Sequence, residues 1–332
     1  KLTPGRKFTP LKAKGSSYHE LEYFDPKEAW DFFAKYYVEQ EDKIKAELKI
    51  DGWRCILQMD SNNKPLIYFE DSKEDNSKNL PSIVNSLKKV NKNGIILDGE
   101  LMESKDNVHW YSRQELATWT SKNPIRDDKN VKIFVFDILY YNGEDLHTKP
   151  LSERWEILKK LAKDFDEHLI LIPSWDINES NQLIKLYNRF NSKIKDEYNY
   201  NLFYGNGIDG FMLKTYNSDY PLTGKTTNWL KLKYQIEANA IVLEKEKNKA
   251  GAYLYKVGYL ISKEDKDKYA PVQELNGKFY GILGKTFATK ISVEVGEIIG
   301  LGMTEIKKTI ENNKIKYTLF QARVLHERKD LV

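Results

Sequence analysis

The sequence has little cysteine, no long apolar run and almost no net charge. Cys55 is the single cysteine among 332 residues, which excludes an internal disulfide and a cysteine-rich zinc site and suits a reducing compartment. No stretch approaches the roughly 18–20 consecutive apolar residues of a membrane-spanning helix. We therefore expect a soluble, intracellular protein of the cytoplasm or nucleoid, with no membrane partner.

The chain nevertheless has enough apolar material to fold. Hydrophobic residues make up 40% and charged residues 31% of the chain, which excludes a disordered or fibrous protein. Its length suits two domains. The sequence starts at Lys1 without a signal-peptide pattern, so we expect one part of a larger polypeptide, a processed product or a trimmed fragment.

Positive charge is concentrated in the last third of the chain. Residues 1–233 hold 36 basic and 36 acidic side chains, whereas residues 234–332 hold 17 and 13. A second basic segment lies at the start, where five basic residues precede the first acid, Glu20. Such segments can bind phosphate, and solvated lysines in a lysine-rich chain give the same distribution.

Hydrophobic periodicity predicts a mixed domain of helices and strands before residue 234. Apolar residues recur at helical spacing in three segments and after Pro81, and they alternate or form buried runs elsewhere. We predict helices at 26–37, 81–90, 151–161 and 178–194. We predict strands from Ile44 onward, a hairpin whose turn is 61–64, and further strands at 94–102, 131–139, 210–214 and 229–233.

The sequence pattern changes near residues 234–237 from mixed helices and strands to short strands only, and we place a domain boundary there. Five short strands are predicted at 240–243, 252–259, 279–283, 293–299 and 317–325, and the charged run 262–268 is predicted to be a solvated loop. Five short strands in about 95 residues suit a small barrel such as an oligonucleotide-binding (OB) fold.

The segment most suggestive of chemistry is Glu47-Leu48-Lys49-Ile50-Asp51-Gly52-Trp53-Arg54. Here Gly52 would permit a tight turn between two strands that presents Lys49. A deprotonated lysine can attack a nucleotide α-phosphate and form a phosphoramidate. The short motif alone is weak evidence, because an exposed lysine beside an Asp-Gly turn has the same sequence.

Five further segments follow a fixed order along the chain and add to the evidence of this motif. They are Pro10-Leu11-Lys12-Ala13, Leu97-Asp98-Gly99-Glu100, the stretch Phe136-Asp137-Ile138-Leu139-Tyr140-Tyr141-Asn142-Gly143-Glu144, Asp209-Gly210-Phe211-Met212-Leu213-Lys214 and Trp229-Leu230-Lys231-Leu232-Lys233. Together with Glu47–Arg54 they resemble the motifs of the covalent nucleotidyltransferase superfamily, most closely those of ATP-dependent DNA ligases.

The resemblance implies an α+β fold: a nucleotidyltransferase (adenylation) domain of antiparallel sheets with flanking helices over residues 1–234, then an OB-fold barrel over 235–332. It also implies ATP and Mg²⁺ as cofactors and nicked double-stranded DNA as partner. The polypeptide is expected to act as a monomer or as part of a larger chain. The lone cysteine excludes the four-thiolate zinc module of NAD-dependent ligases.

The same resemblance assigns roles to individual side chains. Lys49 would be the adenylylated nucleophile, Glu47 would accept a hydrogen bond from the adenine amino group, and Phe136 would stack on adenine. Arg54 and Glu100 would hold ribose and phosphate, and Glu100 and Asp209 would hold Mg²⁺. The cations around the α-phosphate, which would also lower the pKa of Lys49, are Lys214, Lys231 and Lys233. Trp229 is expected to be a core residue.

Four positions depart from the ligase pattern. Glu70 and Asp71 stand where ligases carry Ser-Arg, and Asp209 replaces a glutamate. Lys225 keeps the charge of an arginine without its bidentate fork. The final motif appears only as His326-Glu327-Arg328-Lys329-Asp330, with a histidine for the first arginine and with Arg328 and Lys329 equally explained as an exposed tail.

Three alternatives follow from these observations. An RNA ligase or an mRNA-capping guanylyltransferase uses the same lysine chemistry, although Glu47 favours adenine and the segment Trp229–Lys233 favours DNA ligase. The acids at Glu70 and Asp71, together with His326, also leave open a degenerate nucleic-acid-binding module without catalysis. The sequence favours an ATP-dependent DNA ligase that seals nicks through a lysyl-AMP intermediate.

Overall fold

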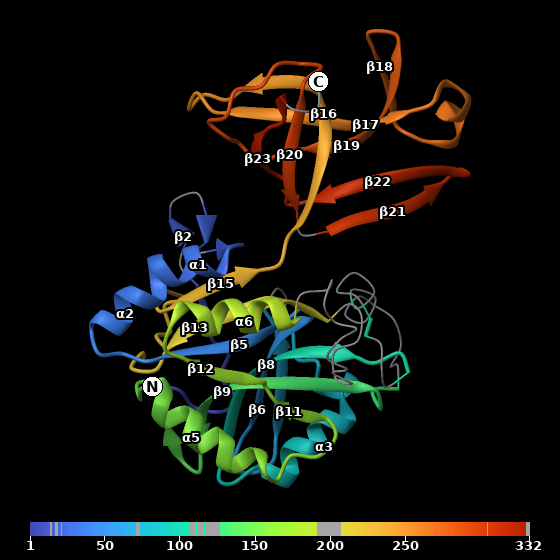
Figure 1. Ribbon diagram of the computed structural model, residues 1–332. Helices are drawn as coiled ribbons and strands as arrows, with labels where there is room; N and C mark the ends of the chain where they lie inside the picture. The colour runs from blue at the N-terminus through green and yellow to red at the C-terminus, as the bar shows by residue number, and fades with distance from the viewer. Residues whose placement is uncertain are drawn as a thin grey trace. The chain divides into compact units, whose positions relative to one another are not determined.

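A computed structural model describes residues 1–13, 15–16, 19–20, 22–70, 74–106, 110–111, 116, 127–190, 207–303 and 305–329. The chain divides into two compact units, Lys1–Lys233 and Tyr234–Val332, which are labelled by element in Figure 1. None of the described helices is long and apolar enough to cross a membrane.

Unit 1 is built mainly from two β-sheets. The six-stranded sheet has the order β10-β9-β8-β6-β7, with β11 also paired to β9. Its strands are β6 (Trp53–Met59), β7 (Pro65–Phe69), β8 (Ile95–Glu103), β9 (Val131–Tyr141), β10 (Glu144–Asp145) and β11 (Leu169–Leu171). The hairpin expected around residues 61–64 is confirmed as β6–β7.

The five-stranded sheet has the order β12-β5-β13-β15-β4. Its strands are β4 (Glu22–Tyr23), β5 (Ile44–Ile50), β12 (Ser174–Ile177), β13 (Ile208–Thr215) and β15 (Trp229–Lys233). Short pairs add β1 (Lys12–Ala13) to β14 (Lys225–Thr226) and β2 (Gly15–Ser16) to β3 (His19–Glu20). Because β5 and β6 belong to different sheets, the segment joining them crosses from one sheet to the other.

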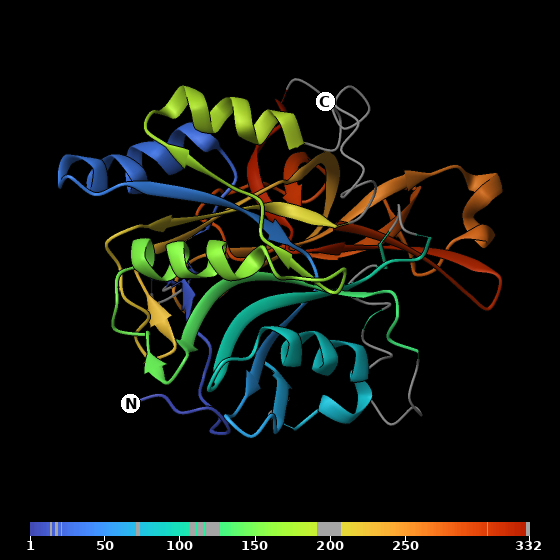
Figure 2. The same cartoon turned by 90° about the horizontal axis from the view of Figure 1, so that it is seen from below.

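Helices flank the two sheets. The helical elements of unit 1 are α1 (Pro26–Ala29), the π-helical segment η1 (Trp30–Ala34), α2 (Lys35–Glu39), η2 (Ser77–Asn79), α3 (Pro81–Val90), α5 (Leu151–Ala162) and α6 (Ser180–Phe190). Helix α6 packs on β12 and β13, α5 on β9 and β11, and α3 on β6. Figures 1 and 2 both place α6 and α3 on opposite sides of the sheets. The predicted helix 178–194 starts at Ser180, and its last four residues lie outside the described ranges.

Each face of the five-stranded sheet has its own chemistry. One face is apolar: Phe211 of β13 packs against Phe190 of α6 and Trp175 of β12 at ring-centroid distances of 6.0 and 6.3 Å. The opposite face meets the six-stranded sheet through a shared core that contains Ile56, Leu139 and the buried Trp229. The expectation that Trp229 is a core residue is confirmed, and the polar side chains beside this core form the candidate site.

Unit 2 is a second, all-β body. Six of its strands form an antiparallel sheet in the order β18-β19-β17-β16-β20-β23. The strands are β16 (Ile236–Lys247), β17 (Tyr253–Ile261), β18 (Val272–Leu275), β19 (Lys278–Lys285), β20 (Ile298–Met303) and β23 (Arg323–Glu327). A separate hairpin joins β21 (Glu305–Glu311) to β22 (Lys314–Phe320).

Several expectations for unit 2 were wrong in detail. The described part of the unit has eight strands where five were expected, because β18 and β21 carry too few apolar residues to show a pattern. Residues 293–297 are not a strand; β20 starts only at Ile298, after a turn at Gly296 with φ of 91°. The expected strand 317–325 is split at Gln321, whose φ is 53°. The charged run 262–268 folds as the 3₁₀ helix η4 (Lys263–Lys268), capped by the Ser262 side chain.

Candidate active site

The polar face of the five-stranded sheet is rich in lysine. Residues directly opposite each other on paired strands point to the same face, and the register pairs Gly210 with Lys49 and with Lys233. The same face therefore carries Lys45, Glu47 and Lys49 from β5, Met212 and Lys214 from β13, and Trp229, Lys231 and Lys233 from β15. Five lysines against one glutamate make this face strongly cationic.

Lys49 is paired with a carboxylate. Its Nζ lies 2.8 Å from Oδ2 of Asp209, and both side chains are about one quarter exposed (21% and 24%). The register skips Asp209, because Ile208 pairs with Ile50 and Gly210 with Lys49. Asp209 is thus the extra residue of a β-bulge, a feature that redirects a side chain. Gly210 is required next to it, because its φ is 144° and a Cβ there would lie 2.1 Å from the carbonyl oxygen of Leu232.

The pair sets the charge of Lys49. Burial favours the neutral amine, but the Asp209 carboxylate, with smaller contributions from Glu100 and Asp51, outweighs burial and raises the pKa of Lys49 above its ordinary value. The expectation that neighbouring cations lower the pKa of Lys49 is wrong, because Asp209 lies within hydrogen-bond distance and raises it. The sequence gives no sign of this contact. The Asp209 carboxylate therefore holds Lys49 in its ammonium form.

Two carboxylates, Asp209 and Glu100, act on the charge of Lys49 and are oxygen donors of the kind that a hard cation prefers. Oδ1 of Asp209 is buried and, among the described residues, has no hydrogen-bond partner. Oε1 of Glu100 accepts from the backbone N–H of Gly52 at 3.2 Å. No group of three or more metal-ligating side chains occurs in the described ranges. This donor set fits Mg²⁺, which is commonly bound by one or two carboxylates together with substrate phosphates.

The tight turn predicted at Gly52 is present, because only Asp51 and Gly52 join β5 to β6 and the chain bends at Gly52. The glycine is needed there for its missing Cβ and not for a positive φ. A Cβ at Gly52 would lie 2.1 Å from the carbonyl oxygen of Leu101. The glycine therefore allows the chain between β5 and β6 to pass close to β8, which brings its N–H to Glu100.

Glu47 is buried between two lysines. Its Oε1 lies 2.6 Å from Nζ of Lys45 and its Oε2 lies 2.7 Å from Nζ of Lys214. All three side chains are at most 2% exposed. Nζ of Lys45 also lies 2.9 Å from the centroid of the Trp155 ring of α5. The carboxylate is therefore held at both oxygens by cations from two different strands.

The rings of Phe136 and Trp229, which we call the aromatic corner, lie next to Lys214, one of the two partners of this carboxylate. Nζ of Lys214 lies 4.4 Å from the ring centroid of Phe136 and 4.0 Å from that of Trp229. The two rings meet edge to face at 6.4 Å. Phe136 is also the extra residue of a β-bulge, because Val135 pairs with Gly99 and the next paired residue is Asp137. The half-buried Phe136 ring and the Glu47 carboxylate thus both lie next to the same ammonium group.

Arg54 of β6 is held by Asp98 of the neighbouring strand β8 in the six-stranded sheet. Its guanidinium makes a bidentate pair with Asp98 at 3.0 and 2.6 Å and donates to the carbonyl oxygen of Leu11 at 2.5 Å. The hydroxyl of Tyr220 donates to Asp98 at 2.6 Å and accepts from the N–H of Leu11 at 2.9 Å. Because Leu11 is fully buried, the N-terminal segment of residues 1–13, which we call the lead-in, is an integral part of this site.

The remaining predicted lysines lie around the lead-in. Lys225 is exposed and pairs in register with Lys12. Burial, with the nearby charges of Lys233 and Lys12, lowers the pKa of Lys231 to about 8. Lys12 forms an ion pair with Glu70. The acid that departs from the ligase pattern is therefore compensated by a lysine of the lead-in, whereas Asp71 lies outside the described residues.

The last predicted motif belongs to unit 2. His326 is exposed and pairs in register with Gly300, where a Cβ would lie 2.8 Å from Nε2 of the histidine ring. Nη1 of Arg328 donates to Oδ1 of Asn239 at 3.0 Å. Arg328 is thus anchored to β16, and Lys329 is exposed and pairs with Glu327 at 3.5 Å.

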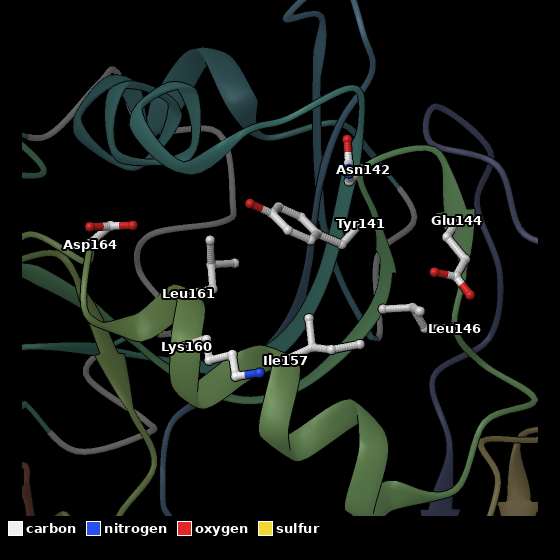
Figure 3. A pocket seen from close by; sticks show the side chains of 8 residues that line it. All are labelled: Tyr141, Asn142, Glu144, Leu146, Ile157, Lys160, Leu161 and Asp164. Atoms are coloured by element: carbon white, nitrogen blue, oxygen red, sulfur yellow. The ribbon is translucent and has the colours of Figure 1, made fainter.

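A pocket of about 340 Å³ lies elsewhere in unit 1, between the end of β9, β10 and α5 (Figure 3). In the close-up the ring of Tyr141 projects into it, with Asp164 on one side and Glu144 on the other. The lining also includes Lys160 and three leucine or isoleucine side chains. None of the residues predicted for the site lines this pocket, and its charges are mixed.

Three residues near the site were not singled out from the sequence. Lys45 was assigned no role because it lies outside the motif, although its alternation with Glu47 and Lys49 on one strand places it on the same face. Asp98 was part of a matched motif but received no function. Tyr220 lies in no matched segment, and only the fold brings it to Asp98.

Together, the fold and the site define a two-sheet protein with a lysine-rich face that carries one buried glutamate. The family model of the ATP dependent DNA ligase domain matches residues 31–233. The chain belongs to this family.

Individual relatives agree. The chain is 27% identical over 205 residues to a DNA ligase of Methanococcus aeolicus, covering 60% of this chain and 34% of that protein. It is 25% identical over 280 residues to a DNA ligase of Natronomonas pharaonis, covering 79% of this chain and 47% of that protein. The chain thus spans between a third and a half of these curated relatives.

Solved structures show the same fold. A structure named Pmar-Lig_Pre has a TM-score of 0.60 at 17% identity and covers 97% of this chain and 68% of that one. The ligase domain of LigD from M. tuberculosis has a TM-score of 0.51 at 14% identity and covers 97% and 95%. The expected sheet-rich ligase-type fold is therefore confirmed.

Proposed function

We propose that this chain is the catalytic core of an ATP-dependent DNA ligase that seals nicks in duplex DNA. The observation that carries the proposal is the position of Lys49: its Nζ contacts Asp209 on a face that presents four further lysines. A nucleophilic amine beside a carboxylate, surrounded by cations, is suited to attack a polyphosphate.

The first reaction would load the enzyme. The Lys49 ammonium first gives one proton to Oδ2 of Asp209, which already accepts a hydrogen bond from it. The neutral amine then attacks the α-phosphorus of ATP, an N–P bond forms, the bond to the pyrophosphate leaving group breaks, and a second proton leaves the nitrogen for solvent. Lys231 and Lys233, on the same face, would neutralise the negative charge of the phosphates.

The next two reactions would use the same centre. An oxygen of the 5′-phosphate at a nick attacks the phosphorus of lysyl-AMP, the N–P bond breaks and Lys49 regains a proton. The oxygen of the 3′-hydroxyl then attacks the phosphorus of the adenylylated 5′-phosphate, an O–P bond forms, the phosphoanhydride bond to AMP breaks, and the hydroxyl proton is released to solvent. Glu100 and Asp209 would hold Mg²⁺, which when bound neutralises charge on the phosphate oxygens.

Base recognition is assigned to the aromatic corner. Adenine presents an amino donor where guanine presents a carbonyl acceptor, and the ionised carboxylate of Glu47 can only accept hydrogen bonds. The neighbouring Phe136 ring offers a stacking face. Arg54 would contact the ribose or phosphate from the opposite sheet while Asp98 fixes its guanidinium. These features support ATP as the nucleotide.

DNA binding is assigned in part to unit 2, for which we propose an OB-type barrel. Its six antiparallel strands enclose a core that includes Val242, Tyr255 and Leu301. The β21–β22 hairpin carries four lysines, of which Lys307, Lys308 and Lys314 are exposed. Lysines on an extended ribbon suit contact with a phosphate backbone. Lys225 and Lys12 of unit 1 would contribute further contacts.

The test is covalent labelling followed by sealing. The full chain is incubated with Mg²⁺ and α-labelled ATP or α-labelled GTP, and Lys49→Ala is compared with the exposed-lysine control Lys43→Ala. We expect acid-labile label from ATP on the wild type and on the control and none on Lys49→Ala. Label from GTP in preference to ATP, or equal label on Lys49→Ala and Lys43→Ala, contradicts the proposal. Nicked DNA and nicked RNA duplexes then identify the strand that is sealed.

A further inference from the structure

Lys45 is a buried cation that the proposed chemistry does not use. Its side chain is fully buried, and its Nζ lies between Oε1 of Glu47 and the ring of Trp155. Burial lowers the pKa of Lys45 to about 8, against the opposing effect of the Glu47 charge. Burying an ammonium is unfavourable unless it is well paired, and an apolar residue of similar volume often serves stability as well. Packing alone therefore does not account for a lysine at this position.

The geometry around Glu47 suggests what Lys45 does. The carboxylate would be free to rotate if only Lys214 held it, because one ammonium can contact either oxygen. Lys45 engages the second oxygen at 2.6 Å from the same strand, so the plane and the direction of the carboxylate are fixed. An ionised carboxylate has about four acceptor positions, and the two lysines use two of them, which leaves capacity for a ligand.

We infer that Lys45 is a positioning residue for nucleobase recognition: it fixes the Glu47 carboxylate so that this group accepts a hydrogen bond from the exocyclic amino group of a bound adenine. The inference rests on the proposed function and adds to it a residue outside the matched motif. Lys45 itself does not reach the base, because its Nζ lies against Glu47 and the ring of Trp155.

The experiment separates base recognition from general support of the site. The full chain carrying Lys45→Met is compared with the wild type in covalent labelling by α-labelled ATP and by α-labelled purine riboside triphosphate, which lacks the amino group at position 6. KM and kcat are measured for both, and equilibrium Kd values for both nucleotides are measured in parallel. Lys43→Met, an exposed lysine two positions upstream, is the matched control.

We expect Lys45→Met to raise KM and Kd for ATP about tenfold, the size of one lost charge-assisted hydrogen bond, with kcat within about twofold. KM and Kd for purine riboside triphosphate should stay within about twofold, because that nucleotide never donates to Glu47. Lys45→Arg should restore ATP binding to within about threefold, since its guanidinium keeps a charged donor next to Glu47.

An equal rise for both nucleotides would assign Lys45 a purely structural role and overturn the inference, as would no change for either. If Lys45→Met lowers Tm below the assay temperature, Lys45→Gln, whose amide still donates without a charge, is judged by the same comparison. A wild type that binds ATP but never becomes labelled would instead contradict the proposed ligase chemistry, and the Kd values would still test Lys45.

Discussion

Lys49 and Asp209 are 160 positions apart in the sequence and form a 2.8 Å ion pair between β5 and a bulge of β13. The bulge places a carboxylate within hydrogen-bond distance of Lys49 on the lysine-rich face. The pair holds the amine in its charged form, and in the proposed loading reaction Asp209 would both position Lys49 and take a proton from it.

Replacing Asp209 by Asn should affect the loading step most. The amide keeps the shape of the side chain but cannot take a proton or bind a cation as a carboxylate does, so we expect the rate of covalent labelling to fall by about 100-fold or more. The measurement is single-turnover labelling with α-labelled ATP. Asp219→Asn, at an exposed aspartate of the same unit, should label like the wild type; a similar loss in both variants would contradict the role of Asp209.

Gly210→Ala should disturb the same bulge through the backbone. The added Cβ would lie 2.1 Å from the carbonyl oxygen of Leu232 and the residue has a φ of 144°, so we expect a loss of about 1–3 kcal/mol in the free energy of unfolding. Denaturant unfolding measures this. An unchanged stability would show that the strand relaxes without cost. Labelling of the folded fraction should also slow, because Asp209 is displaced from Lys49.

Lys231 should make nucleotide binding depend on pH. Its pKa is lowered to about 8 by burial and by Lys233 and Lys12, so its ammonium is largely present below that pH and lost above it. Between about pH 7 and pH 9 the Kd for ATP of the wild type should rise by up to roughly tenfold relative to that of Lys231→Arg, whose guanidinium stays charged. Parallel pH profiles for the two proteins would show that Lys231 does not titrate in this range.

Glu70 should weaken DNA binding without stabilising the fold. Its ion pair with Lys12 is partly exposed, with side-chain exposures of 22% and 39%, and such pairs contribute at most about 1 kcal/mol. Glu70→Gln should therefore leave Tm nearly unchanged and bind nicked duplex more tightly, because Lys12 keeps its charge and an acid is removed. Weaker binding by Glu70→Gln would show that the carboxylate positions Lys12 productively.

The β21–β22 hairpin should contribute salt-dependent affinity. Replacing Lys307 and Lys308 by Ala should reduce the slope of log K against log salt concentration by about 1–2 if these side chains neutralise one or two phosphates. Fluorescence anisotropy with nicked duplex at several salt concentrations measures the slope. Lys249→Ala, in the turn between β16 and β17, serves as the single-lysine control; a hairpin variant with the wild-type slope would remove this element from the proposed interface.

The pattern of residues predicted much of the framework. Alternation and buried runs gave β8, β9, β13 and β15 close to their observed bounds, because each buries one or both faces in a way that local spacing records. In unit 2 the same approach failed for the edge strand β18 and for β21 of the β21–β22 hairpin, because both have mixed polar sequences. The split at Gln321 depends on one residue with positive φ, for which the sequence has no glycine as a signal.

The sequence by itself determined the chemistry available to this protein: which lysines, carboxylates and aromatic rings occur, in what order, and that β5 and β15 each present lysines at alternate positions. Only the tertiary structure decided how those groups are paired. Two bulges turn Asp209 and Phe136 into the site, a close approach at Gly52 brings its N–H to Glu100, and Lys45 and Lys214 meet at Glu47 from separate strands. These pairings depend on register between distant strands, and register is set by packing over the whole sheet rather than by any local motif.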